Sequence, residues 1–381
     1  MKNALVLLLS LLFAACATAP EVPRPEHLFN DRLFAAPSER IRADDVFALS
    51  VEMRRYLDTE IGEQLRTKGP QQGLIDALYS KNQLKVEYDS AKTRNASQTF
   101  AERAGNCLSL MIMTAALAKE LGLSVQYQSV LVDEVWSRSG GLYFAIGHVN
   151  LTVGRRYHDI RSRIDDNAYL TIDFLPLGET RGQRSWVIAE NTVVAMYMNN
   201  RAAEALARGQ VDDAYWWARE AIRQDPVFVS SYNTLGVVYR RHGNSPEAEQ
   251  ALNHALRRDP ENTQLMSHLA AVLGDQGRVT EAKVLSVKLE QKRPYAPYHF
   301  FNQGVAAMQA GDFRTAKEMF SKEVGRDAYN HEFHFWLAAA YARLGDSERA
   351  RKHLGIAMEF SNTRQERDLY AAKLDRISSY H

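Results

Sequence analysis

The sequence predicts an α+β domain followed by an all-α solenoid of helical repeats. Residues 41–195 mix helical and strand-like hydrophobic patterns, whereas residues 196–381 are helical and repeat with a fixed period. An apolar run at the start of the chain predicts that both parts are exported. A chain of 381 residues is long enough for two or three domains, and 45% apolar residues suit sizeable cores.

The composition excludes several classes of function. The net charge is +1, from 47 basic and 46 acidic residues, so we expect no nucleic-acid partner. The two cysteines, Cys16 and Cys107, are too few for a disulfide framework or a thiolate-rich zinc site. The chain has neither a phosphate-loop glycine motif nor a dinucleotide-binding fingerprint. We therefore expect no metal and no cofactor.

Residues 1–15 have the pattern of a signal peptide. Lys2 precedes an apolar run that is shorter than the ~20 residues needed to span a bilayer. The small residues before Cys16 resemble the lipobox of bacterial lipoproteins, although Leu is more usual than Phe13. This resemblance implies that Cys16 becomes the lipidated first residue, which would anchor the protein in a membrane. The alternative is an ordinary signal peptide with a chance cysteine after it.

Residues 16–40 are predicted to form a tether between the anchor and the fold. They are rich in proline and have little periodicity. Ala17 stands where an aspartate often marks retention in the inner membrane, so we expect an anchor in the outer membrane. The protein would then lie in the cell envelope and face the periplasm.

The repeat in residues 196–381 has a period of 34. Alanines recur at that spacing, namely Ala214, Ala248, Ala282, Ala316 and Ala350. Prolines share it, namely Pro226, Pro260 and Pro294. This is the period of tetratricopeptide repeats, in which each unit is a pair of antiparallel helices. We predict about five units, with a protein or peptide partner on the concave surface of the array.

Cys107 is the candidate nucleophile. It begins a hydrophobic stretch with helical spacing that ends near Leu121, so we expect a buried helix with Cys107 at its N-terminus. Unpaired amides and the helix dipole at that end favour negative charge, and hence the reactive thiolate. The same amides would stabilise a developing oxyanion.

Two predicted strands place a histidine and an aspartate on polar faces. Alternation in residues 146–153 puts His148 opposite the apolar side chains, and alternation in residues 169–174 does the same for Asp173. If the two strands are antiparallel neighbours, Asp173 lies beside His148. Cys107 would then attack a carbonyl, His148 would move the proton and Asp173 would orient the imidazole.

These residues resemble the transglutaminase-like superfamily. The resemblance covers roughly residues 75 to 180 and depends on Gly105-Asn106-Cys107, Gly147-His148-Val149 and Ile172-Asp173-Phe174. It implies a papain-like fold and assigns Cys107, His148 and Asp173 to the catalytic positions. Gln98, nine residues before Cys107, is a candidate oxyanion donor, although the resemblance implies no fixed spacing for this residue. The combination with tetratricopeptide repeats is similar to that of certain bacterial lipoproteins.

Two functions remain open at this point. In the first, the protein is a cysteine hydrolase or transamidase that acts on peptide or amide bonds through a thioester. In the second, it is a non-catalytic envelope assembly module, in which the papain-like fold and the repeats only bind partners. Fold resemblance alone does not decide between them.

Overall fold

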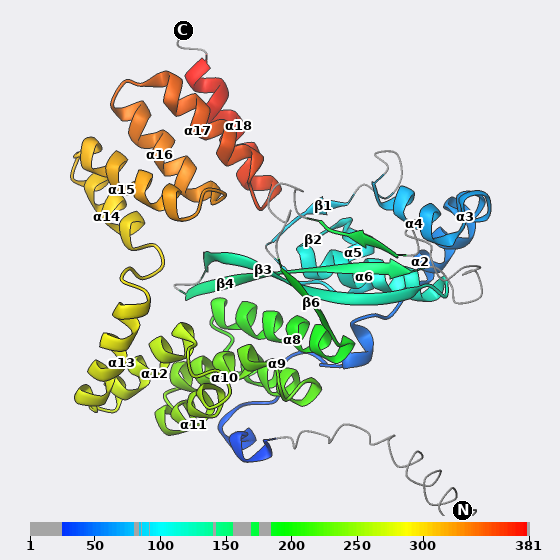
Figure 1. Cartoon of the computed structure of the whole chain (residues 1–381), viewed down its shortest axis with the longest axis horizontal. Helices are drawn as coiled ribbons and strands as arrows, with labels where there is room; N and C mark the ends of the chain where they lie inside the picture. Colours follow the sequence, from blue (N-terminus) through cyan, green and yellow to red (C-terminus); the bar gives the residue numbers. More distant parts are fainter. Residues whose placement is uncertain are drawn as a thin grey trace, which may run out of the picture.

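The computed structural model describes residues 25–79, 84, 86–90, 92–139, 142–154, 169–174 and 184–378. It contains an α+β domain and a helical solenoid that curves around one side of it (Figure 1). Residues 1–15 and Cys16, for which we predicted a signal peptide and a lipid anchor, lie outside the described residues. None of the described helices is both long and apolar enough to cross a membrane.

The α+β domain is built on an antiparallel sheet of four strands in the order β5-β4-β3-β6. The strands are β3 (Ser124–Ser139), β4 (Leu142–Gly154), β5 (Tyr169–Ile172) and β6 (Ser185–Ile188). A short parallel pair joins β1 (Glu87–Tyr88) to β2 (Ala104–Gly105). The helices are α2 (Val51–Arg55), α3 (Gly62–Lys68), α4 (Pro70–Tyr79), α5 (Ala96–Glu102) and α6 (Cys107–Glu120).

Helix α6 is the central helix of this domain. All residues from Cys107 to Ala118 are buried, and the helix packs against β4 and β3. Because it is apolar on every side, it is stable only when it is surrounded by protein. The structure therefore has the α+β domain that the mixed patterns of residues 41–195 indicated.

The solenoid consists of helices α8 to α18. Their bounds are α8 (Glu190–Ala207), α9 (Val211–Gln224), α10 (Val229–His242), α11 (Ser245–Leu256), α12 (Thr263–Asp275), α13 (Val279–Lys292), α14 (His299–Gln309), α15 (Phe313–Arg326), α16 (His331–Arg343), α17 (Ser347–Glu359) and α18 (Arg364–Ser378). Successive helices pack on each other from α8 to α13 and again from α14 to α17, and α18 packs on α17 (Figure 1). This is the all-α solenoid that the 34-residue period predicted.

Glycine explains how each pair of helices turns and packs. A glycine with positive φ follows the first helix of each pair, at Gly209, Gly243, Gly277, Gly311 and Gly345. This left-handed conformation ends a helix at little cost only for glycine. Within α10, a Cβ on Gly236 would come 2.6 Å from Leu252 of α11, so the absence of a side chain permits this close approach.

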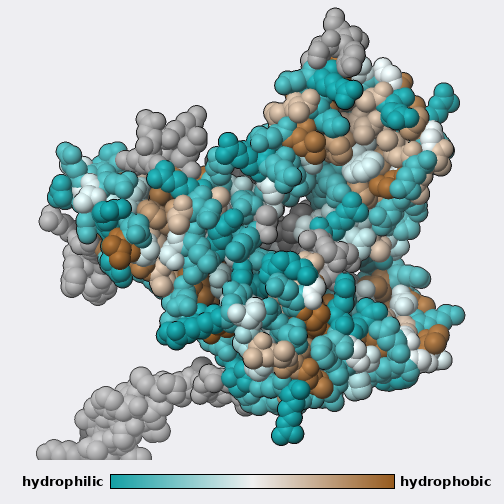
Figure 2. Space-filling view, turned by 180° about the vertical axis from the view of Figure 1, so that it is seen from behind, coloured by the Kyte–Doolittle hydropathy of each residue, from teal (hydrophilic) through white to brown (hydrophobic). Residues whose placement is uncertain are grey.

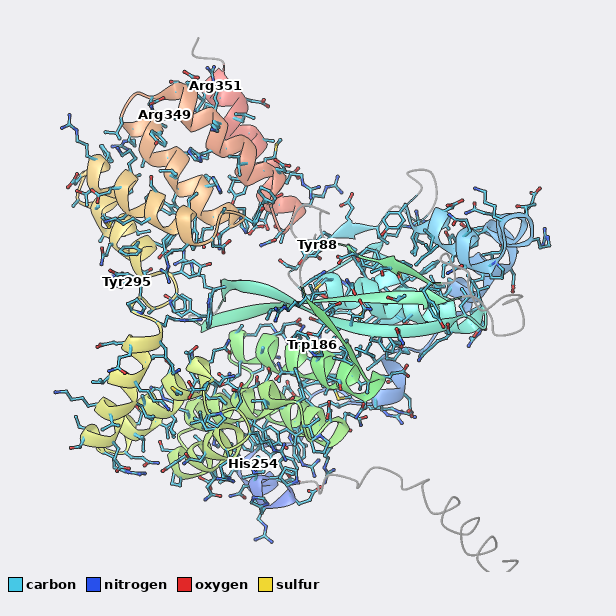
Figure 3. All side chains as sticks on the ribbon, in the orientation of Figure 1. Tyr88, Trp186, His254, Tyr295, Arg349 and Arg351 are labelled. Atoms are coloured by element: carbon cyan, nitrogen blue, oxygen red, sulfur yellow. The ribbon has the colours of Figure 1, made fainter. Side chains whose placement is uncertain are left out.

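The solenoid is interrupted between α13 and α14. Helices up to α12 share one hydrophobic core with the α+β domain, whereas Phe301, Phe320 and Phe333 form a second core. Helix α13 has no buried residue. The exposed Tyr295 lies in the linker that follows it (Figure 3).

The hairpin of β3 and β4 contacts the second block of repeats. Arg138 Nη2 lies 2.5 Å from Glu332 Oε1 of α16, and its guanidinium lies 4.7 Å from the ring centroid of Phe301. The carbonyl oxygen of Trp136 accepts a hydrogen bond from the Tyr298 hydroxyl at 3.3 Å. The hairpin therefore connects the sheet directly to the C-terminal repeats.

The N-terminal segment differs from the predicted tether. Residues 25–39 pack on α9, α10 and α11 instead of extending into solvent, with the short turns η2 (Glu26–Leu28) and η3 (Asp31–Leu33). Phe34 is buried, and its ring stacks on Tyr215 with centroids 3.9 Å apart. The proline-rich composition of the segment concealed this packing, because the apolar residues that dock are few and widely spaced.

Candidate active site

Cys107 is the first residue of α6. The Asn106 side chain caps the helix by accepting a hydrogen bond from Ser109 N at 2.9 Å. Gly105 precedes the cap, where a Cβ would come 2.7 Å from Ser109 Cβ. The amides of Cys107 and Leu108 belong to the first turn, which has no acceptors within the helix. They are available to a negatively charged group near the thiol.

His148 and Asp173 meet across two neighbouring strands. β4 and β5 pair antiparallel with Leu151 opposite Ile172, and Asp173 follows directly after β5. The Nε2 atom of His148 lies 2.8 Å from Asp173 Oδ1. This distance fits a hydrogen bond from the ring N–H to a carboxylate oxygen, which fixes the orientation of the imidazole.

Asn150 is a fourth polar residue of this site. Its side-chain Nδ2 donates a hydrogen bond to Asp173 Oδ2 at 2.9 Å. The two carboxylate oxygens therefore have separate partners, His148 on one and Asn150 on the other. The alternation of β4 had placed Asn150 on the same face as His148, but nothing in that pattern assigned it a role.

The surroundings of His148 favour its protonated form. Burial disfavours the charged imidazolium, but the interactions with Asp173 and Cys107 outweigh burial and raise the pKa of His148 to about 9. The second ring nitrogen, Nδ1, is buried and has no hydrogen-bond partner in the part of the chain that the structure describes. It is therefore available to the sulfur of Cys107. The structure pairs His148 with Asp173, and the electrostatic influence of Cys107 on His148 indicates that the thiol lies near this pair.

Gln98 is located at the start of α5 and is exposed. Its Oε1 accepts a hydrogen bond from Asn95 N at 3.2 Å, and its own amide donates to Asn95 Oδ1 at 2.9 Å. This reciprocal arrangement is a capping box, which holds the Gln98 side chain at the start of α5. The geometry offers no support for Gln98 as an oxyanion donor.

The described residues offer no candidate metal site. Among them, no three or more His, Cys, Asp or Glu side chains group in a way that could hold a metal ion.

The chain contains tetratricopeptide repeats. Residues 233–295 and 301–355 match the family model of the Tetratricopeptide repeat, a class of repeat that mediates protein–protein interaction. No curated protein sequence matches the chain.

Solved structures resemble part of the chain. One comes from the functional characterisation of Pseudomonas aeruginosa PilF, with 19% identity, coverage of 50% of this chain and 94% of that chain, and a TM-score of 0.28. A second is YrrB, described as a tetratricopeptide protein with an unusual peptide-binding site, with 21% identity, coverage of 47% and 92%, and a TM-score of 0.26. A third is a thermophilic tetratricopeptide protein from Thermus thermophilus, with 16% identity, coverage of 47% and 98%, and a TM-score of 0.28.

Proposed function

We propose that the protein is a cysteine-dependent acyl-transfer enzyme with a transglutaminase-like, papain-fold domain that acts on peptide or amide bonds. The observation that carries this proposal is the 2.8 Å contact between His148 and Asp173, with the Cys107 thiol at a helix N-terminus beside the same imidazole. A nucleophile, a base and a group that orients the base are the three parts that such catalysis needs.

The proposed reaction has two steps. The Cys107 thiolate attacks the carbonyl carbon, the C–N bond breaks, and the proton of the His148 imidazolium passes to the leaving amine. The amides of Cys107 and Leu108 stabilise the oxyanion that forms on the way. Water or an amine then attacks the thioester, gives a proton to His148 and releases Cys107. Water as the second nucleophile makes the enzyme a hydrolase, and an amine makes it a transamidase.

The repeats supply a surface that recruits a protein or peptide partner to this site. Figure 2 shows small groups of apolar residues separated by hydrophilic ones on one face of the molecule. A surface of this kind suits a partner held by polar contacts as well as apolar ones.

A second function is an envelope assembly module without catalysis. The observation in its favour is that Cys107 is only 8% exposed and His148 only 3% exposed, which limits access to the thiol. Both functions use the repeats in the same way, so reactivity of the thiol is the property that separates them.

We expect iodoacetamide to alkylate Cys107 faster than a free thiol near neutral pH, and His148→Ala to abolish this advantage. The imidazolium stabilises the thiolate, which is the reactive form, and alanine removes that partner. Mass spectrometry after timed quenching measures the rate. His353→Ala is the matched control, since it changes a histidine of α17, far along the chain. A rate no faster than that of a free thiol, and equal in His148→Ala, would support the assembly module instead.

We also propose that Cys16 is the lipidated N-terminal residue of an envelope lipoprotein that faces the periplasm from the outer membrane. Expressed in a bacterial host, the full chain is expected in the membrane fraction with a mass that includes acyl chains, and Cys16→Ser is expected to lose that mass. Intact mass spectrometry of the membrane and soluble fractions checks this. A processed chain without acyl mass in the soluble fraction would indicate an ordinary signal peptide.

A further inference from the structure

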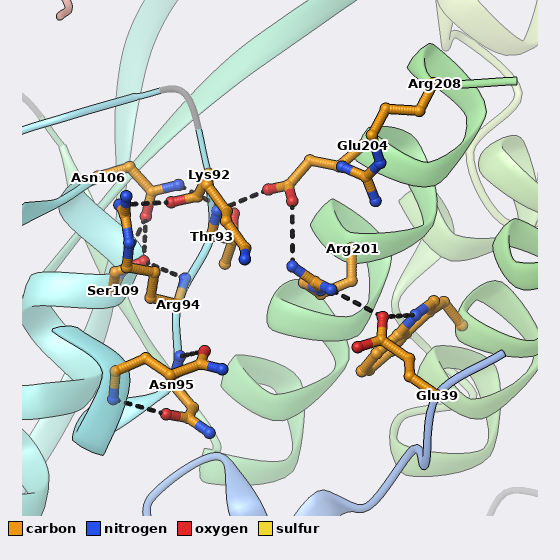
Figure 4. Close-up of polar contacts among 12 residues, drawn as sticks. Glu39, Lys92, Thr93, Arg94, Asn95, Asn106, Ser109, Arg201, Glu204 and Arg208 are labelled. Atoms are coloured by element: carbon orange, nitrogen blue, oxygen red, sulfur yellow. Dashed lines mark hydrogen bonds and ion pairs between the residues drawn. The ribbon is translucent and has the colours of Figure 1, made fainter. Parts of the chain in front are cut away.

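Partly buried polar contacts connect the start of α6 to the first helix of the solenoid (Figure 4). Glu204 of α8 accepts a hydrogen bond from Thr93 N at 2.6 Å through Oε1. Thr93 Oγ1 in turn accepts from Asn106 Nδ2 at 2.9 Å. The other end of the Asn106 amide, Oδ1, accepts from Ser109 N and so caps the helix that begins at Cys107. Hydrogen bonds therefore fix both the nitrogen and the oxygen of the Asn106 side-chain amide.

Arg201 extends this chain of contacts on α8. Its side chain is 9% exposed, with Nη1 at 3.5 Å from Glu204 Oε2 and Nη2 at 2.8 Å from Glu39 Oε1. Glu39 belongs to the docked N-terminal segment and also accepts from Trp217 Nε1 at 3.2 Å. A charge that is buried in this way needs partners, so Arg201 fixes the position of Glu204.

We propose that Glu204, with Arg201 behind it, is a positioning residue for Cys107, so that the first repeat helix forms part of the active site. The inference rests on the proposed function, because it explains how the nucleophile is held. Glu204 fixes the Thr93 backbone, Thr93 fixes the Asn106 amide, and Asn106 fixes the first turn of α6. His148 is held independently by the sheet, so loss of the cap changes the distance between the thiol and the imidazole.

The expected change in the alkylation rate can be estimated from the stability that an N-cap side chain gives to the start of a helix. Loss of an N-cap side chain destabilises a helix start by an amount that corresponds to roughly a fivefold change in an equilibrium constant. Small displacements of a reacting group lower rates strongly. We therefore expect that removing one of the contacts that connect Glu204 through Thr93 to Asn106 slows alkylation of Cys107 by about fivefold or more.

Two substitutions in the full chain test the proposal by the rate of Cys107 alkylation with iodoacetamide from pH 5 to 10. Thr93→Val keeps the shape and the amide of this buried residue but removes the acceptor of Asn106. Glu204→Met removes the acceptor of the Thr93 amide. Both are expected to slow alkylation and to shift its pH profile, whereas Glu204→Gln, which keeps an acceptor oxygen, restores most of the rate.

Glu249→Gln in α11 is the matched control. It weakens the Glu249–Arg278 ion pair of 2.7 Å in the repeats, and it is expected to leave the alkylation rate unchanged. If folded Thr93→Val alkylates at the wild-type rate, the positioning role is overturned even when Glu204→Met fails to fold. If the wild-type thiol reacts no faster than a free thiol, it is the proposed function that fails.

Discussion

Replacing Asp173 with Asn is expected to reduce acylation of Cys107 by about 10³-fold or more. Nε2 of His148 lies 2.8 Å from Asp173 Oδ1, and a carboxylate at that point can only accept a hydrogen bond. An amide NH₂ at the same point donates instead, which forces the N–H of a neutral imidazole onto Nδ1. The nitrogen that should face the thiol as a base would then carry a proton. In this variant the His148 imidazole has the wrong tautomer to act as a base, although the side chains keep their positions.

The measurement is the burst of Cys107 acylation by an activated ester, p-nitrophenyl acetate, with circular dichroism to confirm that the variant is folded. Asn150→Ala is the matched control, because it removes the other hydrogen bond of the same carboxylate, at 2.9 Å, and leaves the His148 contact in place. It is expected to reduce the burst rate by about 10- to 100-fold, which is less than for Asp173→Asn, because Asn150 acts through another residue. Equal rates in wild type and Asp173→Asn would remove Asp173 from the mechanism.

The same substitution is expected to change how stability depends on pH. His148 has its pKa raised to about 9, so its protonation contributes stability that is fully present below the unfolded pKa near 6.5 and is lost as pH rises through about 9. Asp173 supplies part of that increase. The difference in free energy of unfolding between wild type and Asp173→Asn should therefore be larger at pH 6 than at pH 10, which urea unfolding at each pH measures.

The parts of the structure that repeat or alternate could be predicted from the sequence. The 34-residue spacing of Ala214 and its equivalents predicted the solenoid, because each small residue marks a close approach of two helices. The apolar residues after Cys107 predicted a buried helix, and α6 begins at that residue. Period-two alternation placed His148 and Asp173 on polar faces, and the structure gives those two side chains a direct contact.

Contacts between distant segments could not be predicted in this way. Thr93 and Glu204 are 111 positions apart, and neither belongs to a recurring pattern. Arg138 and Glu332 are separated by 194 positions, so nothing local indicates that the hairpin meets the repeats. The period of 34 also persists through Pro294 although the stack is interrupted there. A regular spacing indicates that pairs of helices recur, but it does not indicate whether successive pairs pack on each other.

Phe34→Ala is expected to lower the free energy of unfolding by about 3 kcal/mol. Phe34 is 7% exposed, stacks on Tyr215 and lies with its ring centroid 4.5 Å from that of His242. Truncation leaves a cavity between the N-terminal segment and the repeats, and the polar contacts around it are too exposed to compensate. If the segment were a tether in solvent, Phe34→Ala would leave the free energy of unfolding almost unchanged. This substitution therefore distinguishes a docked segment from the predicted tether.

Urea unfolding measures the change in stability, and amide hydrogen exchange locates it. Ala35 N and Ser38 N donate to Asp212 Oδ1 at 3.1 Å and to Asp213 Oδ1 at 2.7 Å, so both amides are expected to exchange faster in Phe34→Ala. Arg32→Ala, an exposed residue of the same segment, is the matched control and should leave both measurements unchanged. Because Glu39 at the end of this segment contacts Arg201, release of the segment should also slow alkylation of Cys107. Faster exchange with an unchanged alkylation rate would show that docking and the active site are independent.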